Sequence, residues 1–193
     1  MFVAMENTHC PICQFSATQP IFDNTLLKCP KCGHGWANLQ LDQAYLQQLY
    51  AENYFKGEEY ADYLADKEIL QLNFAKRAKQ IAAQGLAPKK ALEIGCAYGF
   101  FYETLKETFP SASYQGHDIS AAAISYANEH FGPYFSAENY LETNSDQTYD
   151  AIFMWDVIEH LSDPGAFLAK ANKEFEPGGM LYLTTGDFGA LLP

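Results

Sequence analysis

The sequence has little positive charge and no long hydrophobic run. Its 193 residues include 12 Lys and Arg against 24 Asp and Glu, which gives a formal net charge of −12 at pH 7. Because nucleic-acid phosphates are bound by clustered basic side chains, we expect no nucleic-acid partner. No segment approaches the ~18 uncharged apolar residues of a membrane span and no signal peptide is visible, so we expect no membrane partner and a cytoplasmic location. The basic residues cluster loosely at Lys76, Arg77 and Lys79 and then at Lys89 and Lys90, and they are expected to solvate a helix face rather than form a docking patch.

Cysteine is also scarce, but four of the five cysteines follow a pattern. Cys10 and Cys13 form one C-x2-C pair, and Cys29 and Cys32 form a second pair 15 residues further on. This is the spacing of a four-thiolate zinc site. Disulfides in a secreted protein are the alternative, which the missing signal peptide disfavours. We therefore expect a structural Zn²⁺ ion that folds a small module over residues 1–40.

A small-residue turn follows a short apolar run in the middle of the chain. Glu93, Gly95, Ala97 and Gly99 are spaced as acidic-x-Gly-x-small-x-Gly. A dinucleotide fingerprint would need a third Gly where Phe100 stands, so that reading is excluded. Such a turn lets a strand pass into a helix whose first amide groups face a bound ligand.

Three further strand-like segments follow this turn. The segment Ser113–Asp118 ends in an acid 23 positions after Gly95, and Ser120 is placed to cap the Ala-rich helix that comes next. The other two segments cover 149–155, which opens into a polar helix start, and 176–185, a turn that feeds a buried strand. Alternating strands and helices predict an α/β fold, a Rossmann-like doubly wound and mostly parallel sheet with ligands at the carboxyl ends of the strands.

The order of these motifs and the residues in them resemble those of the class I S-adenosylmethionine-dependent methyltransferases, over roughly residues 50–190. Within them the chain is most similar to a bacterial subgroup with an amino-terminal zinc module that includes sugar C-methyltransferases. The matching residues are the Cys pairs, Tyr54-Phe55, Tyr60–Tyr63, Glu93–Gly99, Trp155–Leu161, Asp163-Pro164 and Pro177–Gly179. The chain departs from the family at Cys96 and Ala97, where small residues stand in the glycine loop.

The resemblance implies an enzyme that moves a methyl group from S-adenosylmethionine to a carbon or oxygen of a small-molecule acceptor, a nucleotide-linked sugar being favoured. It implies that Glu93 holds the methionine ammonium, Asp118 the ribose hydroxyls, Ile119 the adenine face and Glu138 (or Asn139) the adenine amino group. The loop residues Gly95, Cys96, Ala97, Tyr98 and Gly99 and the strand-end residue Trp155 complete the implied cofactor site. Two alternatives stay open: a protein or RNA methyltransferase that docks its substrate through the zinc module, and a truncated, non-catalytic cofactor-binding module.

The acceptor side is expected at Asp156, Glu159 and His160, which are spaced i, i+3 and i+4 and would share one face of a helical turn. His160 is one candidate general base. The three residues together are instead a candidate site for a divalent ion, and a third reading is that they only cap and orient the loop. The segment is similar to the acidic-x-x-Glu-His segment of ubiquinone-pathway O-methyltransferases.

The rest of the chain divides into a helical linker or lid over residues 41–87 and a cofactor-binding domain over residues 88–193. A short helix is expected from Asp42 to Tyr50, and a longer one from Glu58 to about Ala83. The aromatic residues expected to close over the cofactor are Tyr54, Phe55, Tyr60 and Tyr63. The sequence ends just after the last of the expected strands, which would leave the sheet incomplete at its carboxyl end. A missing carboxyl-terminal region or a partner chain is expected to complete it.

Overall fold

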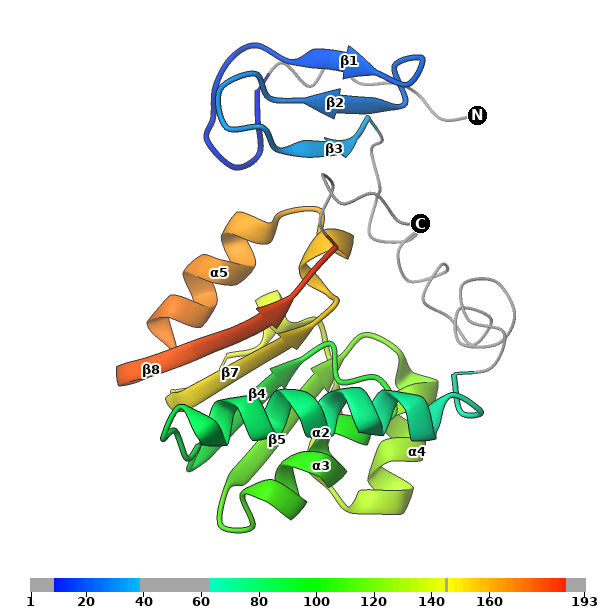
Figure 1. The fold of residues 1–193 in the computed structure, drawn as a ribbon, viewed down its shortest axis with the longest axis vertical. Helices are drawn as coiled ribbons and strands as arrows, with labels where there is room; N and C mark the ends of the chain where they lie inside the picture. Colours follow the sequence, from blue (N-terminus) through cyan, green and yellow to red (C-terminus); the bar gives the residue numbers. More distant parts are fainter. Residues whose placement is uncertain (1–8, 39–62, 145, 187–193) are drawn as a thin grey trace.

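The structure is a computed structural model that describes residues 9–38, 63–144 and 146–186 (Figure 1). The expected helix from Asp42 to Tyr50 lies outside the described residues, and so do the expected lid residues Tyr54, Phe55 and Tyr60. None of the described helices is long and apolar enough to cross a membrane.

A small antiparallel sheet follows the first described residues. Its strands β1 (Gln19–Ile21), β2 (Leu26–Lys28) and β3 (Gly35–Ala37) lie in the order β1-β2-β3. The two C-x2-C turns flank these strands in sequence, one before β1 and the other between β2 and β3.

The second sheet has five parallel strands in the order β6-β5-β4-β7-β8. Their bounds are β4 (Lys90–Ile94), β5 (Ser113–Asp118), β6 (Phe135–Ala137), β7 (Tyr149–Trp155) and β8 (Phe175–Thr184). The central strands β4 and β7 are buried on both faces, which explains why they read as nearly continuous apolar runs. The Rossmann-like, mostly parallel sheet predicted from the sequence is confirmed.

Helices cover both faces of this sheet (Figure 1). The helices α2 (Lys67–Ala83), α3 (Phe100–Thr108) and α4 (Ala121–Phe131) share a buried layer with one face, and α5 (Pro164–Lys173) packs on the other. Phe101 and Phe153 are at the centre of the first layer, with ring centroids 4.8 Å apart. Short 3-10 turns form η2 (Tyr140–Glu142) and η3 (Ile158–His160).

The helix before the first parallel strand is shorter than expected. α2 begins at Lys67 rather than at Glu58, because residues 63–66 form a turn. Its buried residues are Phe74, Ala78 and Ile81, spaced i, i+4 and i+7. The sequence reading also placed Ile69 and Leu72 on the apolar face, but they are 62% and 71% exposed. Both lie on the opposite side of the helix from the buried stripe.

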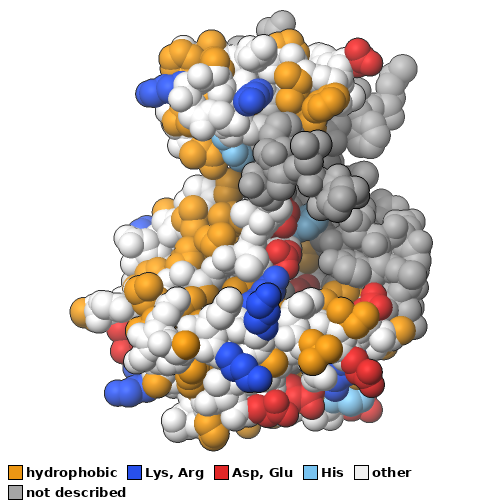
Figure 2. Space-filling model, in the orientation of Figure 1, with side chains coloured by type: hydrophobic (Ala, Val, Ile, Leu, Met, Phe, Trp, Pro, Cys, Tyr) orange, Lys and Arg blue, Asp and Glu red, His pale blue; other side chains and the backbone are white. Residues whose placement is uncertain are grey.

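Among the described strands, β8 forms one edge of the parallel sheet. The expected turn at Glu176–Gly179 is instead an irregularity within the strand, where Gly178 has φ +85° and the register with β7 shifts. The strand is also less buried than expected: the side chains of Met180 and Leu183 are 45% and 38% exposed. Hydrophobic side chains gather along this edge of the molecule (Figure 2).

Candidate functional site

The loop between β4 and α3 is a tight, left-handed turn. It lies at the side of the sheet where the parallel strands have their carboxyl ends, which is called the carboxyl edge below. Gly95, Ala97 and Gly99 have φ values of +76°, +44° and +77°. The carbonyl oxygen of His117 accepts hydrogen bonds from the amides of Gly95 (2.8 Å) and Cys96 (3.2 Å), which ties the loop to β5. A Cβ atom added to Gly95 would lie 2.4 Å from a methyl carbon of Val157, so only glycine fits there without a shift. Ala97 adopts its left-handed conformation at a cost of about 1–2 kcal/mol.

Asp118, at the end of β5, joins this loop to the start of α4. Its Oδ2 accepts a hydrogen bond from the Ala97 amide and its Oδ1 accepts one from the Ser120 amide, both at 2.8 Å. Burial raises the pKa of Asp118, and the two amides oppose that rise. Each carboxylate oxygen has a second lone pair, so further donors can bind. Ser120 caps α4 as predicted, its hydroxyl oxygen accepting from the Ala123 amide at 3.4 Å.

Glu93 is the most buried carboxyl group of the candidate site, with 2% of its surface exposed. Its Oε2 accepts a hydrogen bond from the hydroxyl of Tyr114, on the neighbouring strand. Burial raises the pKa of Glu93 to about 8, although the Tyr114 hydrogen bond works in the other direction. The raised pKa favours the protonated form of Glu93 in the folded chain.

The end of β7 carries an ion pair that the sequence did not reveal. The guanidinium of Arg77, on α2, lies 3.2 Å from Asp156 Oδ2 and 5.0 Å from the ring centroid of Trp155. The expectation that Arg77 only solvates a helix face was wrong, because its side chain reaches from α2 to the tip of β7. The pair joins residues 79 positions apart, and no local sequence pattern reports such a contact.

Asp156, Glu159 and His160 do not share the face of an α-helical turn. Only Glu159 and His160 belong to the 3-10 turn η3, whereas Asp156 precedes it with φ +54°. All three side chains are exposed at the carboxyl edge of the sheet. In the described part of the chain, these three residues do not form a group of potential metal ligands within reach of one another. Their roles toward an acceptor stay predictions.

The remaining predicted residues are placed as follows. Ile119 is 43% exposed beside Asp118, as a residue that covers a ligand would be. Glu138 Oε2 accepts a hydrogen bond from the Ser136 hydroxyl at 2.7 Å. Asn139 Oδ1 accepts one from the Leu141 amide, in η2, at 3.1 Å. Tyr63, the one described residue of the expected lid, stacks on Tyr98 and Phe100 with ring centroids 5.7 Å away in each case.

The four paired cysteines converge on one point. Their sulfur atoms all lie within 4.8 Å of one another, with Cys10 and Cys32 3.7 Å apart and Cys13 and Cys29 3.5 Å apart. A disulfide needs about 2.05 Å, whereas sulfurs at the corners of a tetrahedron with bonds of about 2.3 Å to zinc lie about 3.8 Å apart. Burial works against ionisation of Cys29, yet amide hydrogen bonds from Cys32 and Lys31 lower its pKa, whereas the neighbouring thiols raise the pKa of Cys32. The donor set therefore fits a tetrahedral zinc ion.

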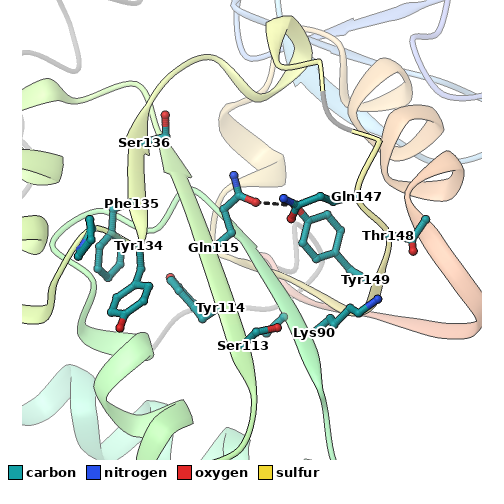
Figure 3. A pocket seen from close by; sticks show the side chains of 12 residues that line it. Lys90, Ser113, Tyr114, Gln115, Tyr134, Phe135, Ser136, Gln147, Thr148 and Tyr149 are labelled. Carbon is teal, nitrogen blue, oxygen red and sulfur yellow. Dashed lines mark hydrogen bonds between the residues drawn. The ribbon is translucent and has the colours of Figure 1, made fainter.

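A cavity of about 330 Å³ lies at the other end of the sheet (Figure 3). It is lined by residues at the amino ends of the strands, including Lys90, Ser113, Phe135 and Tyr149. Polar side chains in it bond within the protein, as where the Tyr149 hydroxyl donates to Gln115 Oε1 at 2.7 Å. This cavity is separate from the loop, Asp118 and the β7 tip, which gather at the carboxyl edge.

The parallel sheet, the glycine loop and the acid at the end of the second parallel strand define a Rossmann-like methyltransferase fold. The family model described as "Methyltransferase domain" matches residues 59–189, and the chain belongs to this family. The ubiquinone biosynthesis O-methyltransferase of Pseudomonas aeruginosa (strain LESB58) is 29% identical over 108 residues, 52% of this chain and 46% of that protein. The malonyl-[acyl-carrier protein] O-methyltransferase of Hahella chejuensis is 30% identical over 51% of this chain and 37% of its own length. The chain thus spans about half, or less, of the curated relatives it matches.

Solved structures share the fold. The plantazolicin methyltransferase BpumL in complex with SAH has a TM-score of 0.56 and 19% identity, covering 72% of this chain and 57% of that chain. The N-methyltransferase NodS of Bradyrhizobium japonicum, in complex with S-adenosyl-L-homocysteine, has a TM-score of 0.50 and 23% identity, covering 56% and 58%.

Proposed function

We propose that this chain binds S-adenosylmethionine and transfers its methyl group to a small-molecule acceptor. The observation that carries the proposal is the Asp118 carboxylate at the carboxyl edge of the sheet, which holds the Gly95–Gly99 loop and keeps lone pairs for further donors. Family membership supports it, and so do the names of the relatives, which are O-methyltransferases.

The residues at this edge fit the cofactor. Asp118 would accept the ribose hydroxyls, Ile119 would cover the adenine, and Glu93 would face the methionine ammonium. Arg77 is a cation at the same edge, and its guanidinium matches the geometry of a carboxylate. Trp155 has a buried indole Nε1–H with no hydrogen-bond partner among the described residues. A polar atom of the bound cofactor could accept a hydrogen bond from it. Glu138 is a weaker candidate for the adenine amino group, because Ser136 already donates to it.

When bound, S-adenosylmethionine supplies an electrophilic methyl group on a sulfonium. The protein has to align the acceptor, exclude water and, for a hydroxyl or carbon acid, remove a proton. We assign proton removal to His160, whose imidazole is exposed at the carboxyl edge, and acceptor positioning to Asp156 and Glu159. Carbon and oxygen acceptors, including a nucleotide-linked sugar, remain within this proposal.

The four cysteines form part of the same proposal. We assign Cys10, Cys13, Cys29 and Cys32 to a structural Zn²⁺ ion, since four thiolates close its coordination shell and leave no open position for catalysis.

Calorimetric titration of the chain with S-adenosylmethionine tests the cofactor site. We expect saturable binding at a ratio of one to one, and a loss of affinity of at least about tenfold in Asp118→Asn, because the amide group cannot accept through both of its heavy atoms. Asp150→Asn is the matched control, since Asp150 also accepts from two backbone amides, those of Lys89 and Lys90, but at the opposite edge of the sheet. Absence of binding by the folded wild-type chain, or equal losses in both variants, would contradict the proposal.

A further inference from the structure

A buried acid and a buried phenol meet on the sheet face that α2, α3 and α4 cover. Glu93 lies opposite Gly116 in the register of β4 and β5, and Tyr114 is two residues before Gly116 on the same side of β5. A Cβ atom built on Gly116 would lie 2.9 Å from the Tyr114 hydroxyl oxygen and 2.9 Å from Cys96 Sγ. The missing side chain of Gly116 therefore leaves the space through which the Tyr114 ring reaches Glu93.

The hydrogen bond between these groups fixes the acid in one orientation. Tyr114 donates to Glu93 Oε2, and its ring is itself only 8% exposed. The ring is held on its other side by Tyr102 (ring centroids 5.0 Å apart) and Phe135 (5.4 Å apart). A carboxyl group bonded to a side chain this tightly packed has little rotational freedom.

Within residues 9–38, 63–144 and 146–186, no counter-ion balances a charge on Glu93. Its titratable neighbours are Tyr114 and the Asp118 carboxylate from β5, and the thiol of Cys96 from the loop. Among the residues that the structure describes, no Lys, Arg or His forms an ion pair with Glu93. Burial, and secondarily the negative charge of Asp118, raise the pKa of Glu93 to about 8 against the effect of the Tyr114 bond.

The buried layer on this face gives the acid little else to interact with. α2 and α3 contribute the aromatic rings of Phe74, Phe100 and Phe101 to it. A cation brought to such an acid favours the ionised form strongly, because the surroundings screen the charge poorly.

We propose that Tyr114 positions the Glu93 carboxyl, which carries a proton in the cofactor-free protein and gives it up to solvent when the ammonium group of the cofactor binds. The O–H bond of the acid breaks, its electron pair stays on the carboxylate oxygen and the proton passes to the buffer. The inference deepens the proposed function and rests on it, because the cation is that of the methionine part of S-adenosylmethionine. Tyr114 is a positioning residue here, since it acts through Glu93.

Calorimetric titration with S-adenosylhomocysteine, in pairs of buffers with different ionisation enthalpies, counts the protons released. We expect close to one proton per cofactor at pH 6 and 7, and an affinity that rises nearly tenfold between these pH values, the limit for one linked proton. Glu93→Gln keeps the shape of the side chain without the proton, so this release and this pH dependence should disappear. Any proton release that remains in Glu93→Gln comes from titration of the ligand itself and is subtracted.

Tyr114→Phe separates positioning from packing. It keeps the ring and removes the donor, so the midpoint of proton release should move up by about one to two pH units. Tyr102→Phe removes the hydroxyl of the adjacent ring, which does not bond to Glu93, and should leave the midpoint unchanged. A purely structural role for Tyr114 predicts an affinity loss that is equal at all pH values, and that result would overturn the inference.

Infrared difference spectra of the cofactor-free chain follow the protonated carboxyl directly. We expect a band that titrates near pH 8 in the wild type and is absent in Glu93→Gln. A band that titrates near the ordinary pKa of glutamate, or cofactor binding without proton release, would overturn the inference alone. A band at pH 8 in a chain that binds no cofactor would instead overturn the proposed function, and the release on binding with it.

Discussion

At the scale of single residues, the candidate site depends on side chains that hold two segments together. Asp118 joins the glycine loop to α4, and Arg77 joins α2 to the end of β7. Asp118 and Glu93 could be predicted from the sequence because a motif sets their distance along the chain from Gly95. Arg77 and Tyr114 could not, because their partners lie on other elements and only the folded sheet brings them together.

Glu93 also makes the stability of the protein depend on pH. Its pKa in the folded state, about 8, is above its ordinary value of 4.5, so the folded chain binds a proton that the unfolded chain releases. The contribution of this proton to stability is complete below about pH 4.5 and is lost as the pH rises to about 8. Between these limits the free energy of unfolding of the wild type should fall relative to Glu93→Gln by a few kcal/mol, at most about 5.

Urea denaturation of both proteins at pH 5 and pH 8.5 measures that difference. Glu103→Gln, a substitution of a half-exposed glutamate on α3, is the control and should keep the pH dependence of the wild type. A constant gap between wild type and Glu93→Gln at the two pH values would show that the acid is ionised in the folded protein.

At the scale of elements, short-range rules located the parallel strands and the helix α4 but set other boundaries poorly. Strands β4 and β7 are buried, largely apolar runs that a sequence shows directly, whereas β5 is mostly polar in sequence and was located by the acid at its end. The start of α2 was placed too early, because apolar residues spaced at three and four occur on both sides of that helix. Tertiary packing decides which apolar face of α2 is buried. The face with Phe74, Ala78 and Ile81 is buried, so Ile69 and Leu72 are exposed.

The helix α5 tests a local rule. Asp163 caps it by accepting a hydrogen bond from the Ala166 amide at 2.9 Å, with Pro164 in the first turn. Asp163→Ala should lower the free energy of unfolding by about 1 kcal/mol, the usual contribution of an N-cap. The affinity for the cofactor should not change. Ser162→Ala, one residue earlier, should have no measurable effect, and denaturant midpoints of the two variants give the comparison. Equal midpoints would mean that the cap contributes nothing to stability.

At the scale of the whole molecule, the four-cysteine cluster and the candidate cofactor site lie on separate sheets. A segment with three strands of three residues each has little core, so its fold should depend on the metal. We expect one zinc per chain by elemental analysis, and loss of that zinc in Cys10→Ser. Chelation should unfold the β1–β3 module and leave the parallel sheet folded.

Cys96→Ser is the matched control, because Cys96 is the remaining cysteine and lies outside the cluster. It should keep the full zinc content. Metal content below half an ion per chain in the freshly purified wild type would contradict the assignment of the four thiolates.

Each sheet also contains its own fluorophore. Of the two tryptophans in the chain, Trp36 is on β3, stacked on His34 beside the cysteines, and Trp155 is at the end of β7 beside Arg77. Indole emission shifts with the polarity of its surroundings, and both indole Nε1 atoms are buried here. Trp36→Phe therefore leaves emission that reports on the carboxyl edge of the parallel sheet, and Trp155→Phe leaves emission that reports on the cysteine module. Metal loss and cofactor binding can then be followed separately, each by the indole emission of its own single-tryptophan variant and without an added label.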